Sequence, residues 1–173
     1  MLATVASLTA TVVAYGCGYA LAGRGSTLPS YIKTVHIPPL ENRTPVSRLE
    51  TVLTDRIRVE FINRGKYEVV QSEADADAQL KGEVVAFTLQ TAGLNEQQLS
   101  SRYLVTIVLK VSFIGLRNKE VLWSNDALTF RDEYQFSTGG VVVTTLLDQE
   151  RSTMTRIATD ASRTIVTAIM EAF

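Results

Sequence analysis

The only cysteine of this chain, Cys17, lies in an uncharged and mostly apolar stretch that runs from Met1 to Gly23. One cysteine cannot form an internal disulfide, nor can it supply the several thiolate ligands of a cysteine-rich zinc site. His36 is the only histidine and has no acidic residue close by in the sequence. We therefore expect no catalytic or metal-binding role for His36, and covalent modification is the chemistry to consider for Cys17.

The four residues that end at Cys17, AYGC, resemble a bacterial lipobox. In that motif a peptidase cleaves before the cysteine, and the thiol receives a diacylglycerol. Residues 2–13 contain only Leu, Ala, Thr, Val and Ser, which matches the apolar region of an export signal, about 7–15 residues long. The pattern predicts a signal peptide over residues 1–16 and lipid attachment at Cys17.

Two alternatives to lipidation remain open at this stage. A membrane-spanning helix needs about 20 apolar residues, and the stretch from Met1 to Gly23 barely supplies them. Cys17 could also be an ordinary small buried residue. An exported lipoprotein explains in addition why no second cysteine is present, because an unmodified lone thiol would stay unpaired outside the cytosol.

Composition excludes several functional classes. The chain carries 17 basic and 18 acidic residues in 173, a net charge of -1, so it lacks the strongly basic face that nucleic-acid binding requires. It contains no P-loop, dinucleotide fingerprint or G-x-S-x-G elbow. Asp75 and Asp77 have no further oxygen-ligand motif beside them, so a solvated turn is expected there. We expect no enzyme activity, no cofactor and no metal.

The chain is predicted to contain one folded domain behind a tether. Residues 22–31 are rich in Gly, Ser and Pro, which is typical of a linker. The predicted organisation is a signal peptide over 1–16, a lipidated N-terminus and linker over 17–31, and a single domain over 32–173.

A first helix is predicted after residue 44. Thr44 before Pro45 could cap it, or Ser47 and Glu50 could form a capping box, and Gly65 is expected to end it. Large apolar residues recur there at steps of three and four and form one stripe: Leu49, Val52, Leu53, Ile57 and Phe61. In the preceding loop, Asn42 is expected to cap or turn the chain.

The strongest strand pattern covers residues 102–114. Tyr103, Val105 and the following odd-numbered residues form an apolar face. Thr106, Lys110 and Ser112 share the other face with Leu104 and Val108, which makes it semi-polar. Further strands are predicted over 33–38, 67–71, 80–89 and 121–136, a hairpin loop over 90–100, and a second helix over 148–173.

The order of these elements predicts an α+β fold. Two helices with one apolar face each can cover only one side of a sheet. The expected architecture has two layers: a mixed, four- to five-stranded sheet with both helices packed on one face. On the polar side of the second helix, Arg156 and Asp160 are spaced to pair with each other.

Five segments occur in an order that resembles the lipopolysaccharide-assembly lipoproteins, the LptE-like family. These segments are CGYAL, VHIPPLENRTP, ADAQLKGEV, SRYLVTIVLKVSF and LDQERSTMTRIATDASRTIVTAIMEAF. The resemblance implies a lipid-anchored protein on the periplasmic side of the outer membrane. It also implies a non-catalytic plug and assembly partner of LptD, the β-barrel translocon that inserts lipopolysaccharide into the outer leaflet.

The resemblance carries over to few individual residues. The lipidated cysteine corresponds to Cys17. In the family, lipopolysaccharide contacts involve basic residues in loops, but residues 90–101 and 137–147 contain no Lys or Arg here. The nearest cations are Arg102, Arg117 and Lys119, which we take as candidate contacts for lipid A phosphates.

Two alternative functions remain. The protein could be another envelope lipoprotein scaffold, because the N-domains of curli-secretion and Tol-associated proteins also place a strand before an asparagine-containing loop such as LENRT. It could also be a small envelope hydrolase, in which case His36 would be required for activity.

Overall fold

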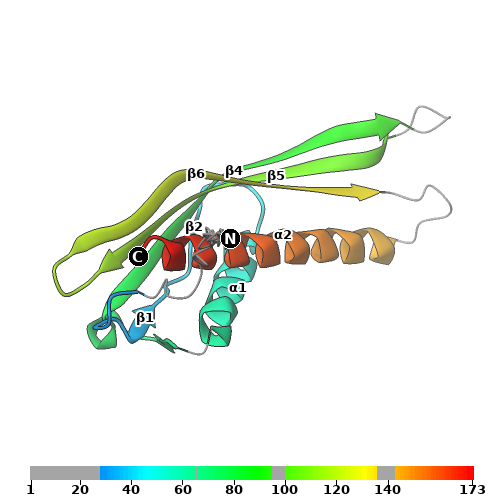
Figure 1. The fold of residues 1–173 in the computed structure, drawn as a ribbon. Helices are drawn as coiled ribbons and strands as arrows, with labels where there is room; N and C mark the ends of the chain where they lie inside the picture. Colours follow the sequence, from blue (N-terminus) through cyan, green and yellow to red (C-terminus); the bar gives the residue numbers. More distant parts are fainter. Residues whose placement is uncertain (1–27, 65, 95–99, 136–142) are drawn as a thin grey trace, which may run out of the picture.

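Two helices lie on one face of a long, twisted sheet (Figure 1). The structure, a computed structural model, describes residues 28–64, 66–94, 100–135 and 143–173. Within these ranges the sheet has six strands and mixes parallel with antiparallel pairing. The predicted α+β class is confirmed. The strand number exceeds the predicted four to five, because a strand of two residues, β2 (Glu41–Asn42), also pairs with the sheet.

The sheet combines a parallel part with an antiparallel meander. The meander consists of β4, β5 and β6, and the strand order across the sheet is β3-β1-β4-β5-β6. Strand β1 is parallel to both of its neighbours, and β2 is parallel to β4. The strands are β1 (Thr34–His36), β3 (Glu68–Val70), β4 (Ala78–Leu94), β5 (Ser100–Gly115) and β6 (Glu120–Gln135).

Two of the three meander strands, β4 and β5, are longer than predicted, while β6 is close to its predicted bounds. Strand β4 has 17 residues and continues to Leu94, and β5 begins at Ser100, so much of the hairpin loop expected over 90–100 is strand. Thr91 pairs with Tyr103 and Gly93 with Arg102. Polar side chains gave this segment the appearance of a loop, but the pairing is made by the backbone, and threonine is well suited to strands.

The core lies between the sheet and the helices. The odd-numbered residues of β5 from Val105 to Phe113 are at most 2% exposed, as their alternation predicted. The apolar stripe of α1 (Leu49–Asn63) faces them, and the rings of Phe61 and Phe113 stack with centroids 6.2 Å apart. Helix α2 (Val143–Glu171) is longer than predicted at its start and buries Ile157, Ala158, Ala161, Ile165 and Ile169.

The start of α1 differs from both predicted caps. The helix begins at Leu49, and its N-cap is Arg48, which has φ 67° and makes no side-chain capping bond. Asn42 accounts for the difference. Its Oδ1 accepts hydrogen bonds from Thr44 N and Oγ1 at 2.9 and 2.8 Å, and its Nδ2 donates to Glu50 Oε2 at 2.7 Å. Asn42 thus binds the side chains of Thr44 and Glu50, each of which belonged to one of the predicted caps. Its expected role in turning the chain is confirmed. Gly65 lies outside the described residues.

Asp77 is not part of a solvated turn, contrary to the prediction. Its Oδ2 accepts hydrogen bonds from Lys33 N at 2.8 Å and from Thr34 N and Oγ1 at 3.0 Å. The two backbone donors of Lys33 and Thr34 contribute most to lowering the pKa of this carboxyl below its ordinary value. Asp77 therefore joins the start of β1 to the start of β4, while Asp75 is exposed on a short 3₁₀ helix, Glu73–Asp75.

Candidate functional site

One candidate binding surface is the side of the meander that points away from the helices. We call it the open face. By the strand register, it carries Thr88 and Gln90 of β4, the even-numbered residues 104–112 of β5, and Ser124, Thr129, Arg131 and Glu133 of β6. Both helices lie on the opposite side of the sheet (Figure 1). Among the described residues, no helix or strand covers the open face.

Several charges on the open face are paired locally, while Arg131 and Lys81 have no ion-pair partner among the described residues. Lys110 Nζ lies 2.9 Å from Asp126 Oδ1, and Glu83 is the cross-strand neighbour of Lys110. The Asp126 carboxylate, with a smaller contribution from Glu83, raises the pKa of the exposed Lys110 ammonium. Threonine and serine side chains supply most of the other polar groups. The open face can therefore form many hydrogen bonds without presenting a strong charge of one sign.

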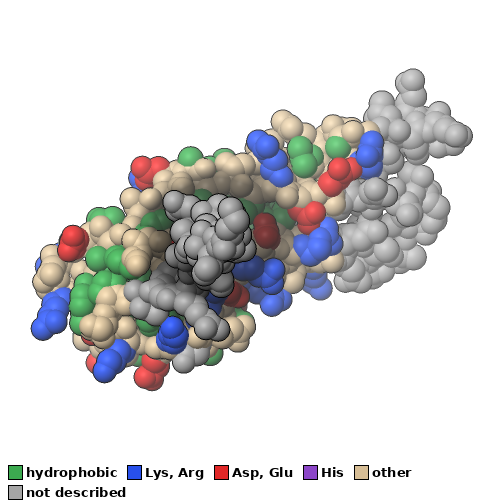
Figure 2. Space-filling model, viewed as in Figure 1, with side chains coloured by type: hydrophobic (Ala, Val, Ile, Leu, Met, Phe, Trp, Pro, Cys, Tyr) green, Lys and Arg blue, Asp and Glu red, His purple; other side chains and the backbone are tan. Residues whose placement is uncertain are grey.

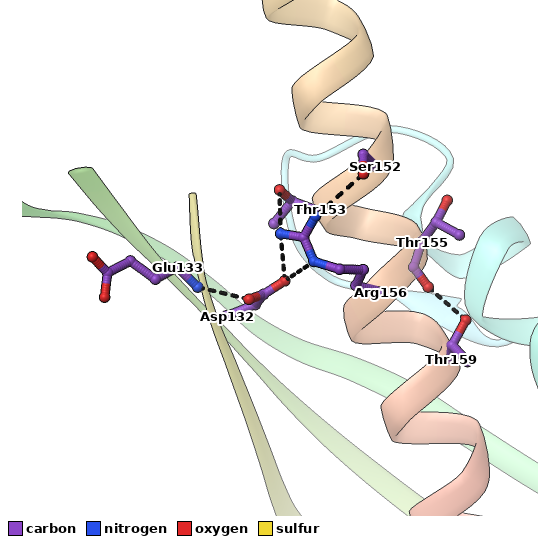
Figure 3. A network of polar contacts seen from close by, with 7 residues as sticks. All are labelled: Asp132, Glu133, Ser152, Thr153, Thr155, Arg156 and Thr159. Atoms are coloured by element: carbon purple, nitrogen blue, oxygen red, sulfur yellow. Dashed lines mark hydrogen bonds and ion pairs between the residues drawn. The ribbon is translucent and has the colours of Figure 1, made fainter. Parts of the chain in front are cut away.

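A polar network attaches β6 to α2 on the helix side of the sheet (Figure 3). The Arg156 guanidinium places Nε 2.9 Å and Nη2 2.8 Å from Asp132 Oδ2. The same guanidinium donates to the hydroxyls of Ser152 and Thr153. Arg156 therefore pairs across elements with β6, and the predicted pairing with Asp160 is wrong. The sequence could not reveal this contact because 24 residues separate its partners.

Arg102 lies at one end of β5 and is already engaged. Its Nη1 lies 3.4 Å from Glu133 Oε1 on β6. The side chain also crosses Gly93 of β4, where a Cβ on residue 93 would come within 2.8 Å of Arg102 Nε. The missing side chain of glycine makes room for the guanidinium. Arg102 is 49% exposed, so an anion could reach it only in competition with Glu133.

Arg117 and Lys119 lie at the other end of β5, in the turn before β6. The Arg117 guanidinium carbon stands 5.8 Å from the centroid of the Tyr31 ring. It borders a cavity of about 570 Å³ that Glu73 and Asp77 also line, and these carboxylates oppose anion binding there. Lys119 has φ 52° and is exposed, with no ion-pair partner among the described residues.

The three candidate cations do not form one site. A strand rises about 3.3 Å per residue, so Arg102 and Gly115 lie roughly 40 Å apart along β5. One lipid phosphate cannot contact Arg102 together with Arg117 or Lys119. The predicted lipid attachment residue, Cys17, lies outside the described residues.

In the part of the chain that the structure describes, His36 and the acidic residues do not form a recognisable catalytic or metal-binding site. His36 Nδ1 lies 3.2 Å from Val70 O, a contact in which this nitrogen donates. No three His, Cys, Asp or Glu residues in the described ranges converge into a possible metal site. None of the described helices is both long and apolar enough to cross a membrane.

Solved structures of lipoproteins share this fold. Lipoprotein B from Nitrosomonas europaea aligns with a TM-score of 0.56 and 16% identity, over 86% of this chain and 87% of that one. Rare lipoprotein B from Shewanella oneidensis aligns with a TM-score of 0.51 and 13% identity, over 78% of this chain and 92% of that one. A minor lipoprotein from Acinetobacter baumannii aligns with a TM-score of 0.50 and 19% identity, over 82% of this chain and 93% of that one. At these identities the likeness establishes the fold alone.

Sequence comparison identifies the family. No curated protein matches the sequence. A family model described as "LptE: Lipopolysaccharide-assembly" matches residues 32–169, which is most of the chain. The protein therefore belongs to the LptE family of lipopolysaccharide-assembly lipoproteins, which act in lipopolysaccharide transport and outer-membrane assembly.

Proposed function

We propose that this protein is the lipid-anchored partner of an LptD-like β-barrel in the outer membrane. It would reach the barrel from the periplasmic side and act as its plug and assembly partner. The protein would perform no catalysis, in keeping with a family of non-enzymatic lipoproteins. The family match does not favour the alternative of a curli-secretion or Tol-associated scaffold.

The observation that carries this proposal is the character of the open face. The interior of a large barrel is polar, and burial against it is favourable only if polar groups find partners. The open face sets hydroxyls and the Gln90 amide among a few apolar side chains such as Leu104 and Val108, and Lys110 has its countercharge in Asp126. It therefore suits a polar wall better than an apolar partner surface, and it would bring few unpaired charges into the contact.

The shape of the meander also supports this role. Strands of 16 or 17 residues extend about 50 Å at the usual rise. The helices cover one side of this length, and the network of Asp132 and Arg156 fixes α2 to β6. The result is a stiffened, elongated body with one free polar side.

We propose further that Cys17 is lipidated after removal of residues 1–16, and that residues 17–31 tether the domain of residues 32–173. Replacement of Cys17 by Ala should abolish incorporation of labelled palmitate and release the protein from membranes. Retention of the variant in the membrane fraction would favour an uncleaved anchor or attachment through a partner.

Contacts with lipopolysaccharide at Arg102, Arg117 and Lys119 are part of the proposal. Because Arg102 is distant from the other two, each end of β5 would contact a separate phosphate group. Lys119 has no ion-pair partner among the described residues and should contribute more than Arg102, which must leave Glu133. Charge-neutralising variants at the two ends should therefore have additive effects on binding.

The proposed partnership is tested by purifying the tagged full chain from outer membranes and identifying what accompanies it by mass. We expect a large β-barrel in stoichiometric amount. Recovery of the protein alone from the periplasm would contradict the proposal. As a control for the hydrolase alternative, His36→Ala should leave barrel recovery unchanged.

A further inference from the structure

A groove lies where the start of α1 approaches α2, on the helix side of the molecule and away from the open face. It has a volume of about 580 Å³. At the other end of α1, Arg64 Nη2 donates to Thr167 Oγ1 at 2.7 Å and ties the two helices together. The residues that line the groove are Val46, Ser47, Arg48, Leu49, Val52, Arg151, Met154 and Thr155.

The lining combines apolar walls with positive charge. Val46, Val52 and Met154 are half-buried and pack against the core. Arg48 and Arg151 are exposed and come from different elements. No carboxylate is among the lining residues. Figure 2 shows several Lys and Arg side chains gathered over the region where α1 meets α2.

The two arginines differ from the other unpaired cations in their setting. Neither Arg48 nor Arg151 has a carboxylate within ion-pair distance among the described residues, and the same holds for Arg56 and Arg163 on the same two helices. Arg56 and Arg163 do not line this groove. Among the grooves formed by the described residues, the one at Arg48 and Arg151 thus brings together two guanidinium groups with no carboxylate beside them.

Two like charges across one groove repel each other, and an anion between them removes that repulsion. Arginine binds phosphate well because its planar fork can donate two parallel hydrogen bonds. Apolar walls beside the charges favour a ligand that carries hydrocarbon next to its anionic group. A pocket of this size is within the range that small-molecule ligands occupy, about 300–1,000 Å³.

We propose that this groove binds a phosphorylated amphiphile, with its phosphate between Arg48 and Arg151 and its acyl chain against Val46, Val52 and Met154. Lipid A and membrane phospholipids both have this chemistry. The inference rests on the proposed function only in that lipopolysaccharide is one such amphiphile. It adds a site separate from Arg102, Arg117 and Lys119.

Methionine methyl NMR can test the site directly. The chain has three methionines; Met154 lines the groove, and Met170 is 7% exposed in the core and serves as an internal control. The full chain, labelled at its methionine methyl groups and held in an uncharged detergent, is titrated with inorganic phosphate, a short-chain phosphatidylglycerol and lipopolysaccharide. We expect saturable shifts of Met154, and not of Met170, with one or both lipids.

A matched pair of double variants separates the groove from general electrostatics. Arg48→Gln with Arg151→Gln should weaken lipid binding by roughly tenfold or more, since hydrogen bonds to charged groups are lost. Arg56→Gln with Arg163→Gln removes the same charge from the same helices and should change binding less than about twofold. Thermal unfolding of both variants shows whether the fold is retained; if the groove variant unfolds, Thr155→Trp, which fills the groove, replaces it.

The outcomes separate the possible occupants. Tighter binding of either phosphatidylglycerol or lipopolysaccharide shows whether the amphiphile is a membrane phospholipid or lipid A. Equal saturation by inorganic phosphate alone would overturn the proposal, as would equal weakening by the control variant. A Met154 shift that occurs only in the complex with a barrel would assign the groove to a protein segment instead. Recovery of the barrel tests the proposed function separately, and the groove variant should leave it unchanged.

Discussion

Replacement of Asp77 should destabilise the fold by an amount that depends on pH. Oδ2 of Asp77 accepts three hydrogen bonds, two of them from the backbone N–H groups of Lys33 and Thr34. A hydrogen bond to a charged group contributes about 1.5–3 kcal/mol. Because the side chain is only partly buried, water can replace some of these bonds. We expect Asp77→Ala to lower the free energy of unfolding by about 2–4 kcal/mol at pH 7.

The pH dependence isolates the contribution of the charge. The hydrogen bonds lower the pKa of Asp77 below the ordinary value of 3.8, so the folded state favours the ionised form. The resulting stability is fully present above the unfolded pKa and is lost as the pH falls through the lowered folded value. Asp77→Asn keeps an acceptor oxygen but no charge. Its deficit relative to the natural chain should be constant from pH 7 to about pH 5 and should shrink below pH 4.

Urea unfolding of the full chain provides the assay. Trp123, the only tryptophan, is partly buried on β6 and packs against the core, so its fluorescence should report unfolding. Asp75→Ala is the matched control, because Asp75 is exposed two residues away and should change stability by less than about 0.5 kcal/mol. If Asp77→Ala were as mild as this control, or if the deficit of Asp77→Asn did not change with pH, the role given to Asp77 would be wrong.

Three further substitutions test other parts of the fold. Asn42→Ala removes four hydrogen bonds from the loop before α1 and should cost about 1–3 kcal/mol in urea unfolding; full stability would refute its role. Ile57→Ala opens a cavity at a fully buried position and should cost about 2–5 kcal/mol, whereas Val59→Ala at the exposed side of α1 should cost little. Arg156→Gln should change global stability by less than about 1 kcal/mol, because the pair with Asp132 is partly exposed. Amide exchange near Asp132 should nevertheless accelerate, and unchanged protection there would show that the network does not hold β6.

The sequence predicted the elements whose side chains repeat regularly. The stripe of α1 and the alternation of β5 each have one apolar face, and burial follows those faces: Leu53, Ile57, Ile107 and Leu109 are fully buried. Such patterns depend only on the local geometry of a helix or a strand. The two-layer arrangement then follows, because each apolar face must be covered.

Features that depend on contacts distant in the sequence were missed. Asp77 and Lys33 are 44 residues apart, and no spacing rule connects them. Strand β2 has two residues and exists only because β4 is beside it. The groove between Arg48 and Arg151 requires the crossing of two helices that are distant in sequence. The separation of Arg102 from Arg117 and Lys119 follows from the strand predicted between them, but the sequence could not show that Arg102 is engaged by Glu133 on β6.

The central claim is that the open face contacts the wall of a β-barrel. A photo-reactive amino acid at Thr88, which is exposed on the open face, tests it directly in cells, with Thr164 on the exposed side of α2 as the matched control. We predict that light joins the Thr88 variant to a large β-barrel in high yield and the Thr164 variant far less. Efficient cross-linking from Thr164 with none from Thr88 would contradict the account.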